Sequence, residues 1–337
     1  MTIQINEIQG KKILVTGAGG FIGGHLVRRL ARNNTVIATD IKPLKQWVQS
    51  NIIPYQYSNY DLTNRNVCKK LFEDESPQYV FNLAADIGGM FWITNHRADL
   101  IDNNALINLN IIWASSFYNV ERLFFSSSAC VYPYTLQEEL NSPPLKESDV
   151  LPANPEAYYG WEKLFTEKVL EAYALDRGLK TRVARFHSVY GPGCDYTAQR
   201  GKAPAALIRK CIEAKNGDKI EIWGNGKQQR TFLYIDDCID GIVKIMESDY
   251  HHPFNLGTKE VNSIDEVADI AIRLSGKNLG RWYNLNMPRG VNCRSADREL
   301  AKNKLNWEPN ITLEEGMKRM YDYVYKALLE ESSKTKA

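Results

Sequence analysis

The sequence predicts an α/β fold in which a doubly wound parallel sheet is followed by a smaller C-terminal lobe. Apolar runs of strand length alternate with segments of helical periodicity as far as residue 192. The first run leads into a glycine-rich turn, and after residue 193 the alternation gives way to a loop, short strands and several helices. We therefore expect a sheet domain at 1–192, to which 235–247 can contribute, a substrate-binding lobe at 193–330 and a disordered polar tail at 331–337.

Composition argues against several classes of function. The 337 residues carry a net charge of +2, which does not indicate a nucleic-acid groove or a membrane-surface role. The six cysteines lack Cys-x-x-Cys spacing, which favours reduced thiols over a disulfide framework or a zinc site, so no metal is expected. The N-terminus has no cationic flank followed by an apolar core, and no apolar run approaches the roughly 20 residues of a membrane span. These features predict a soluble cytoplasmic protein.

The glycine-rich turn has the context of a dinucleotide-binding fingerprint. Lys12–Thr16 is a predicted buried strand, and a segment of helical spacing at 24–32 follows the turn. Gly17 permits the tight turn, Gly20 lets backbone N–H groups approach a pyrophosphate, and Gly23 lets the helix pack close to the strand. The spacing is Gly-x-x-Gly-x-x-Gly, a variant of the commoner Gly-x-Gly-x-x-Gly. This unit predicts a Rossmann domain.

An acidic residue at the end of the second predicted strand favours NAD as the cofactor. Asp40 follows the strand at 35–39, roughly 20 residues beyond the glycines, where a ribose-binding carboxylate is expected. A carboxylate accepts hydrogen bonds from a ribose 2′-OH and repels a 2′-phosphate. Lys42 and Lys45 lie just beyond and weaken this preference for NAD over NADP.

Other predicted strand ends also suit a cofactor. Asp61-Leu62 closes a short strand, and the buried strand at 79–83 ends in small residues that suit the floor of a cofactor site. A flexible loop at 87–90 and a helix at 96–119 come next. The expected cofactor contacts are Gly17, Gly20, Phe21, Ile22, Gly23, Asp40, Asp61, Leu62, Leu83, Ala84, Ala85, Tyr159, Lys163 and Phe186.

A hydroxyl-rich segment, Ser126–Tyr132, follows the predicted strand at 122–125. In an open parallel sheet, ligands bind at this end of the strands. Ser128 is therefore placed to hydrogen-bond a substrate oxygen, and Cys130 to move a proton. A lone cysteine is more often a buried packing residue, so the functional interpretation depends on its partners.

Those partners are expected on the helix at 157–177. It carries Tyr159 and Lys163 four residues apart and so on one face. A tyrosine is a poor base at neutral pH, but an adjacent ammonium and a bound nicotinamide cation favour its phenolate. With Ser128 holding the same hydroxyl, this arrangement removes a proton from an alcohol while hydride leaves its carbon. The alternative is a packed aromatic ring beside an extended lysine.

The order of these motifs resembles that of the extended short-chain dehydrogenase/reductase family along essentially the whole chain. Further segments resemble its GDP-mannose 3,5-epimerase subfamily. The family resemblance is carried by Gly17–Gly23, Ser126–Ala129, Tyr159 with Lys163, and Arg185–Pro192; the subfamily resemblance is carried by Phe81–Asp86, Gly88–Met90, Ser127–Cys130, Arg185–His187 and Lys202–Ala206.

The resemblance implies an NAD-dependent epimerase that binds a GDP-sugar and forms a homodimer. It implies that Cys130 and Lys202 are an acid–base pair and that Arg230 and Arg294 lie near the diphosphate. Oxidising sugar C4 to a ketone acidifies the protons on C3 and C5, and inversion then needs a base on one face and an acid on the other. Which of the pair is the base stays open. The expected substrate contacts are Gly88, Met90, Ser128, Cys130, Ser188, Lys202, Ala203, Lys210, Arg230 and Arg294.

Two departures and three alternatives accompany this interpretation. Ser188 stands where the subfamily usually has Asn, and Gly201 where it has Glu, so a related GDP-sugar such as a heptose is an alternative to GDP-mannose. A 4,6-dehydratase usually has an Asp-Glu pair where this chain has Ala129-Cys130, and a simple C4 epimerase has no need of the cysteine. A non-catalytic NAD-binding protein often loses the Tyr or the Lys, whereas this chain keeps both.

Overall fold

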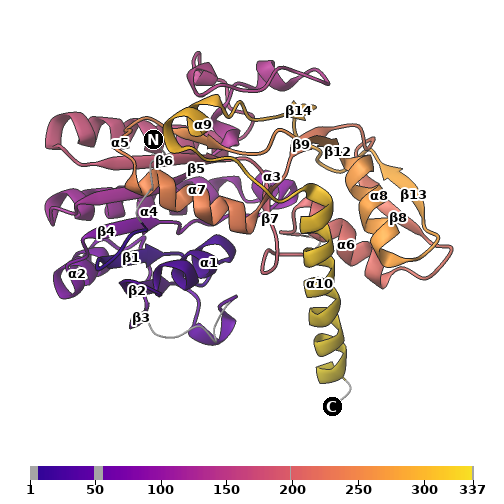
Figure 1. Ribbon diagram of the computed structural model, residues 1–337, viewed down its shortest axis with the longest axis horizontal. Helices are drawn as coiled ribbons and strands as arrows, with labels where there is room; N and C mark the ends of the chain where they lie inside the picture. Colours follow the sequence, from indigo (N-terminus) through magenta and orange to yellow (C-terminus); the bar gives the residue numbers. More distant parts are fainter. Residues whose placement is uncertain (1–6, 49–55, 198, 336–337) are drawn as a thin grey trace.

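The computed structural model describes residues 7–48, 56–197 and 199–335 and consists of a large sheet domain with a lobe at one end (Figure 1). The sheet has seven strands in the order β11-β6-β5-β4-β1-β2-β3, and every pairing is parallel. The strand order reverses between β1 and β4, which creates the crevice where α/β sheets bind ligands. The strands are β1 (Lys12–Thr16), β2 (Thr35–Asp40), β3 (Gln56–Asn59), β4 (Tyr79–Asn82), β5 (Arg122–Ser128), β6 (Thr181–Phe186) and β11 (Phe254–Leu256).

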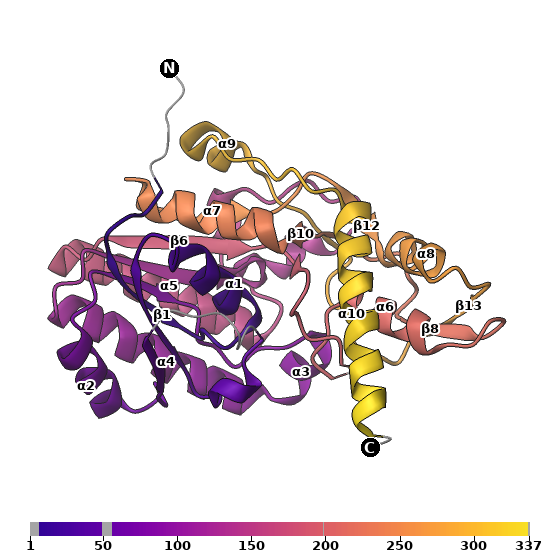
Figure 2. The ribbon, with the colours of Figure 1, turned by 60° about the horizontal axis from the view of Figure 1, so that its bottom comes forward.

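Helices cover both faces of this sheet, as a doubly wound fold requires. Successive residues of β1 point to opposite faces, so Ile13 and Val15 join one apolar core and Leu14 the other. The first core includes α1 (Phe21–Leu30) and α7 (Ile235–Glu247); the second includes α2 (Arg65–Glu75), α4 (Arg97–Phe117) and α5 (Tyr158–Arg177). Figures 1 and 2 show the two sets on opposite sides of the sheet. The predicted α/β doubly wound fold is confirmed.

The lobe is built from short strand pairs and three packed helices. A parallel pair, β8 (Lys219–Trp223) and β13 (Gly280–Asn284), lies beside α6 (Ala203–Glu213) and α8 (Ile264–Ser275). A second small sheet joins β9 (Gln229–Thr231) to β12 (Val261–Ser263) and β14 (Cys293–Arg294). A third pair joins β7 (Val189–Tyr190) to β10 (Leu233–Tyr234). The remaining helices are α3 (Met90–Asn95), α9 (Glu299–Leu305) and α10 (Leu313–Thr335), with 3-10 turns η1 (Leu44–Gln46), η2 (Ala129–Val131), η3 (Tyr134–Gln137) and η4 (Glu147–Val150).

Two boundaries predicted from the sequence differ from the structure. The polar tail predicted to be disordered at 331–337 is helical to Thr335, because α10 packs on α6 and α8 and Tyr196 donates a 2.8 Å hydrogen bond to Glu331. Residues 336 and 337 lie outside the described residues. The contribution of 235–247 to the sheet domain agrees with α7, which packs on the main sheet, whereas β11, predicted to lie in the lobe, is a strand of that sheet.

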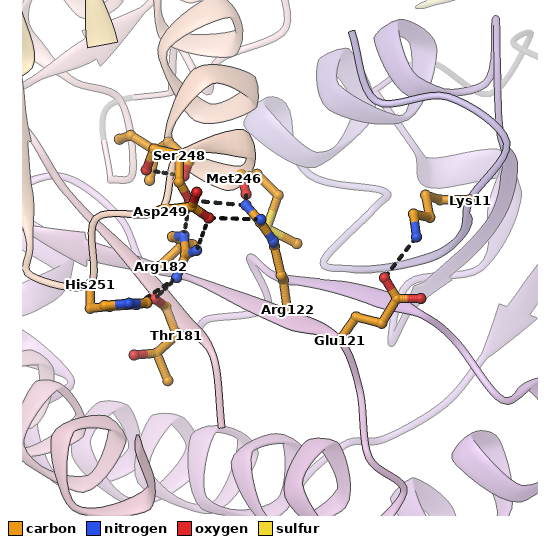
Figure 3. Close-up of polar contacts among 10 residues, drawn as sticks. Lys11, Glu121, Arg122, Thr181, Arg182, Met246, Ser248, Asp249 and His251 are labelled. Atoms are coloured by element: carbon orange, nitrogen blue, oxygen red, sulfur yellow. Dashed lines mark hydrogen bonds and ion pairs between the residues drawn. The ribbon is translucent and has the colours of Figure 1, made fainter. Parts of the chain in front are cut away.

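Two arginines, Arg122 and Arg182, hold the segment between α7 and β11 against the sheet (Figure 3). Arg122, the first residue of β5, donates to the carbonyls of Met246 and Ser248 at 2.7 and 2.9 Å. Arg182 of β6 donates to the Ser248 carbonyl at 2.7 Å and bonds the His251 ring at 3.0 Å. Cations at a helix C-terminus are favourable, so this cluster holds the end of α7 against the amino ends of the central strands.

Neither a membrane-spanning helix nor a metal-binding group of side chains is found in the described residues. Within 7–48, 56–197 and 199–335, no helix has the length and apolar character needed to cross a bilayer. In the same ranges, no group of three or more His, Cys, Asp or Glu side chains is arranged to hold a metal ion.

Candidate active site

A cavity of about 1220 Å³ lies at the carboxyl ends of the central strands, where the sheet meets the lobe. Its wall contains every candidate residue named from the sequence, both the cofactor set and the substrate set. The set spans residues 17 to 294, so the fold brings together segments that are far apart in the chain. The structure thus places these residues together, and the role of each one stays a prediction.

The glycine turn forms one end of the cavity and suits a pyrophosphate. Gly17 has a φ of +66°, and a Cβ there would lie 2.7 Å from the carbonyl oxygen of Leu83. Gly23 packs so closely on Gly17 that any side chain would clash with its carbonyl. The first residue before α1 is Gly20, and among the described residues no side chain caps the helix. The backbone N–H groups of this helix start are therefore available to an anion in the cavity.

Asp40 is held in the orientation that a ribose contact needs. Its carboxylate is nearly buried, at 8 % exposure, and accepts from the backbone N–H groups of Gly19 and Lys42, each at 2.9 Å. A carboxylate has about four acceptor sites, so two such bonds leave capacity for hydroxyl donors. The glycine cradle and this fixed carboxylate together fit an adenosine diphosphate moiety.

The neighbouring strand, β3, ends three residues earlier than the sequence indicated. Asp61-Leu62 was predicted to close a strand, but β3 ends at Asn59. Asp61 instead organises a turn, because its Oδ1 accepts from the backbone N–H and the hydroxyl of Thr63 at 3.0 and 2.7 Å. Both Asp61 and Leu62 still line the cavity.

Ser128, Tyr159 and Lys163 meet where β5 ends and α5 begins. Tyr159 is 8 % exposed and Lys163 1 %. Burial raises the pKa of Tyr159 well above its usual value; nearby Cys130 and Glu162 act in the same direction, and a hydrogen bond with Ser128 opposes them. The Lys163 Nζ lies 5.5 Å from the centre of the Tyr159 ring. The site therefore holds the tyrosine protonated until a cation or a ligand favours its phenolate.

A buried carboxylate next to Lys163 was missed from the sequence. Glu162 Oε2 lies 3.7 Å from the Lys163 ammonium, and Oε1 accepts from Asn108 and Thr166 at 2.7 and 2.9 Å. Asn108 in turn accepts from Asn82 at the end of β4. Glu162 was not among the predicted site residues, because no sequence signal marks which carboxylate on a helix is buried.

Cys130 packs against an apolar cluster and also contacts an arginine. Arg294 donates from Nη1 to the Cys130 sulfur at 3.2 Å, and its other groups bond Gln137 and Glu156 at 2.5 and 3.0 Å. Burial opposes the Arg294 charge, but Cys130 and Glu156 outweigh it, so the Arg294 pKa is raised. The sequence predicted Arg294 as a diphosphate contact; the structure adds a contact to the thiol that sequence spacing could not reveal.

Arg230 lies close to Arg294 on the same wall. Its guanidinium donates to the backbone carbonyls of Gln229 and Val291, both at 2.7 Å. Burial, and next the Arg294 charge, lower the Arg230 pKa to about 10. Two neighbouring guanidinium groups with one nearby carboxylate leave a positive region on this wall, which suits an anionic ligand.

Lys202 enters the cavity from the lobe, as the residue before α6. The side chain lines the cavity and is exposed to solvent there. Desolvation by the surrounding wall lowers the Lys202 pKa, opposed by three thiols, Cys194, Cys130 and Cys238. A lowered pKa is the condition under which a lysine exchanges protons closer to neutral pH, and Cys130 lines the same cavity.

The two departures from the subfamily pattern have local structural explanations. A Cβ on Gly201 would lie 2.5 Å from the carbonyl oxygen of Thr197, so the turn before Lys202 requires glycine. Gly201 is therefore required by the local turn. Its effect on which GDP-sugar fits the site stays a prediction. Ser188 has a φ of +34°, in the left-handed region where asparagine is also tolerated. Lys210, another expected substrate contact, is ion-paired to Glu221 at 3.0 Å.

The chain is similar in sequence and fold to several nucleotide-sugar enzymes. The chain is 38% identical to GDP-mannose 3,5-epimerase of Arabidopsis thaliana over 96% of its own length and 84% of that protein. It is 27% identical to GDP-L-fucose synthase 1 of the same plant over 94% and 93% of the two chains. UDP-glucose 4-epimerase of Thermotoga maritima, solved with UDP-glucose, is 28% identical, with a TM-score of 0.84 over 94% of this chain and 99% of that one.

A further solved structure contains the cofactor predicted here. UDP-glucuronic acid 4-epimerase of Bacillus cereus, in complex with UDP-glucuronic acid and NAD, is 28% identical, with a TM-score of 0.82 over 94% and 99% of the two chains. Residues 13–257 match the family model for NAD dependent epimerases and dehydratases. The chain belongs to the NAD dependent epimerase/dehydratase family, and NAD is its cofactor.

Proposed function

We propose that this protein inverts C3 and C5 of GDP-mannose, or of a closely related GDP-sugar, through a transient ketone at C4. The observation that carries the proposal is that Cys130 and Lys202 line the same cavity as Ser128, Tyr159 and Lys163. The 38% identity to GDP-mannose 3,5-epimerase over 96% of the chain supports the choice of substrate.

The first step belongs to the side chains at the end of β5 and the start of α5. NAD held in this cavity would supply the hydride-transfer chemistry at C4. Ser128 orients the C4 hydroxyl, and Tyr159 takes its proton. Lys163, whose Nζ lies 5.5 Å from the centre of the Tyr159 ring, favours through its positive charge the phenolate that this transfer requires.

The second step belongs to Cys130 and Lys202. With a ketone at C4, the protons on C3 and C5 become acidic, and a base on one face with an acid on the other inverts each centre. Arg294 donates a hydrogen bond to the Cys130 sulfur and so places a positive charge against it. The lowered Lys202 pKa brings the amine closer to the working pH.

The rival reactions lack their residues at this place. Elimination of water by a 4,6-dehydratase calls for an acid–base pair of carboxylates after the hydroxyl residue, whereas η2 provides Ala129 and Cys130. A simple C4 epimerase uses the first step alone and leaves Cys130 and Lys202 without a task.

Solvent exchange tests the proposal. The purified protein with NAD and GDP-mannose in D2O is expected to incorporate deuterium at C3 and C5 and not at C2, read by NMR. Incorporation at C5 with loss of the C6 hydroxyl would indicate a dehydratase. Inversion at C4 without deuterium at C3 and C5 would indicate a C4 epimerase.

We also propose that the protein is a homodimer, paired through α4 and α5. These adjacent helices expose large apolar side chains on the outer surface of the sheet domain: Leu106, Leu109, Phe117, Trp161 and Phe165. An apolar surface of this kind is typical of a subunit interface. Sedimentation should give twice the monomer mass, and Phe165→Glu should give the monomer. The cytoplasmic location inferred from composition stays a prediction.

A further inference from the structure

Two loops from different halves of the chain are joined beside the cavity by one arginine. The first loop, 83–89, follows β4 and leads into α3; the second, described at 191–197 and 199–202, lies between β7 and α6. Arg200 belongs to the second loop, and its side chain reaches across to the first. Nothing in its sequence context marked it, because a single arginine beside a glycine is usually a solvated surface charge.

The Arg200 guanidinium has two contacts with the first loop and a third with α3, the helix that follows it. It forms an ion pair with Asp86 at 3.2 Å and donates to the Ile87 carbonyl at 3.3 Å. It also lies over the Trp92 ring, 3.5 Å from the ring centre. Trp92 donates to the same Asp86 oxygen at 3.1 Å and stacks on His96 at 3.6 Å. Arginine suits such a site, since its flat guanidinium stacks and hydrogen-bonds at once.

The backbones of the two loops also touch. The Gly89 N–H donates to the Arg200 carbonyl at 2.9 Å. A Cβ on Gly89 would lie 2.7 Å from the Gly201 carbonyl oxygen, and one on Gly88 would lie 2.6 Å from Trp92 Cβ. Only glycines permit this approach. The close packing of Gly88 and Gly89 therefore serves the join between the loops as well as the cavity wall.

The first loop is itself anchored to the sheet domain. Asn104 of α4 accepts from the Asp86 N–H at 2.7 Å and donates to the Asp86 carbonyl at 3.1 Å. Asn104 is fully buried. A chain of contacts thus runs from α4 through Asp86 to Arg200, two residues before Lys202, and Gly201 is tied to Thr197 at 2.8 Å.

We propose that Arg200 is a positioning residue that fixes Lys202 relative to the sheet domain, where Cys130 and Tyr159 lie. This inference rests on the proposed function, because it assigns Arg200 to the second step and not to the first. Lys202 is the proposed acid–base residue that the lobe supplies. Two kinds of contact join its turn to the first loop, namely those of the Arg200 side chain and the backbone hydrogen bond between Gly89 and Arg200.

A different role for Arg200 would be direct binding of a substrate phosphate. The Asp86 carboxylate and the Trp92 face already engage the guanidinium, so its charge is largely compensated in the structure. The two roles give different kinetics. A phosphate ligand contributes to binding, and its loss raises KM; a positioning residue contributes to the geometry of proton transfer, and its loss lowers the maximal rate of exchange at saturating substrate.

The test compares Arg200→Ala, Arg200→Lys and Asp86→Asn with the unmodified protein. Deuterium incorporation at C3 and C5 is measured at saturating GDP-mannose, together with NADH absorbance after mixing, which reports the first step. We expect Arg200→Ala to lower exchange by about 10–10²-fold while NADH formation changes by less than about 3-fold. Arg200→Lys should recover part of the loss, because it keeps the charge opposite Asp86. Arg273→Ala, which removes an exposed ion pair with Glu314, is the matched control and should change neither reading.

A double-mutant comparison links the two residues. Since Arg200 and Asp86 act through one contact, Arg200→Ala with Asp86→Asn should lose little more exchange than Arg200→Ala alone. Additive losses would contradict a shared role. A raised KM with unchanged exchange at saturation would assign Arg200 to phosphate binding and overturn the proposal, as would equal losses in both steps.

Amide hydrogen exchange tests the contact between the two loops without requiring catalysis. Arg200→Ala should speed amide exchange in 83–96, since Asp86 loses its ion pair and Trp92 its stacked cation, while α5 keeps its protection. Unchanged exchange in 83–96 would refute the join itself. If the unmodified protein exchanges no deuterium into C3 or C5, the proposed function fails, whereas this reading still decides whether Arg200 joins the loops.

Discussion

The two steps proposed for this cavity are served by parts of the molecule that are built differently. Ser128 and Tyr159 come from β5 and α5, adjacent elements of the sheet domain, and Lys163 lies in the buried part of the same helix. Lys202 comes from the lobe and reaches the cavity from the start of α6. The hydride half is therefore held by a continuous core, and the proton half by loop contacts between two parts of the chain.

Because of this difference, a substitution in the hydride half should affect other steps than a substitution in the proton half. Loss of a group in the hydride half stops everything, because no proton at C3 or C5 is acidic before C4 is oxidised. Loss of a group in the proton half leaves oxidation at C4 intact. Each of the following substitutions places a residue in one half or the other.

Tyr159→Phe should have the largest effect. It removes the base for the C4 hydroxyl, and we expect NADH formation and deuterium incorporation at C3 and C5 to fall together by about 10³-fold. Stopped-flow absorbance and NMR measure the two. Tyr158→Phe, at an exposed position on the same helix, is the matched control and should retain activity. Normal deuterium incorporation in Tyr159→Phe would mean that the C4 ketone is not on the path.

Lys202→Ala should separate the halves. We expect deuterium incorporation at C3 and C5 to fall by at least about 10²-fold. NADH should still form, because Lys202 is not one of the side chains of β5 and α5 that serve oxidation at C4. Lys215→Ala, in the turn beyond α6 and outside the cavity wall, provides the control. Loss of NADH formation at saturating substrate would place Lys202 in the hydride half.

Asp40→Asn should have a smaller effect, confined to the cofactor. The amide keeps one acceptor for the Gly19 or Lys42 N–H but removes the charge, and a hydrogen bond to a charged group contributes about 1.5–3 kcal/mol. We expect NAD affinity to fall by roughly 10-fold, measured by calorimetry, and the preference over NADP to narrow. Tighter binding of NADP than NAD by the unmodified protein would contradict this role for Asp40.

The pH dependence of exchange sharpens the comparison further. Burial lowers the Lys202 pKa below its usual 10.5, so the ammonium form is lost as pH rises through that lowered value. The exchange rate at saturating substrate should therefore show a limb below pH 10.5 that Lys202→Arg removes. A limb that rises with pH identifies Lys202 as the base, and one that falls identifies it as the acid. A limb that persists in Lys202→Arg belongs to another group.

The hydride half was predictable from sequence because its geometry is local. The four-residue spacing of Tyr159 and Lys163 puts both on one helix face, and Gly17, Gly20 and Gly23 mark a turn with few alternatives. Asp40 was also predictable, since it ends a strand beside the glycine turn in any sheet of this order.

The surroundings of the proton half were not predictable in the same way. Arg294 lies 164 residues from Cys130 in the chain, and Arg200 lies 114 from Asp86, so no spacing rule connects them. Glu162 is adjacent to Lys163, yet its burial depends on Asn108 from another helix. The helical end of α10 depends likewise on packing against the lobe, where composition alone indicated disorder.

Cys130→Ala, read in one sample by NADH absorbance and by deuterium incorporation from D2O, tests most directly whether one cavity holds two separable steps. The account predicts that NADH still forms on mixing with GDP-mannose while incorporation at C3 and C5 falls by at least about 10²-fold, and that Cys130→Ser behaves in the same way. Full incorporation in Cys130→Ser would show that the thiol only packs against Arg294, and would contradict its place in the proton half.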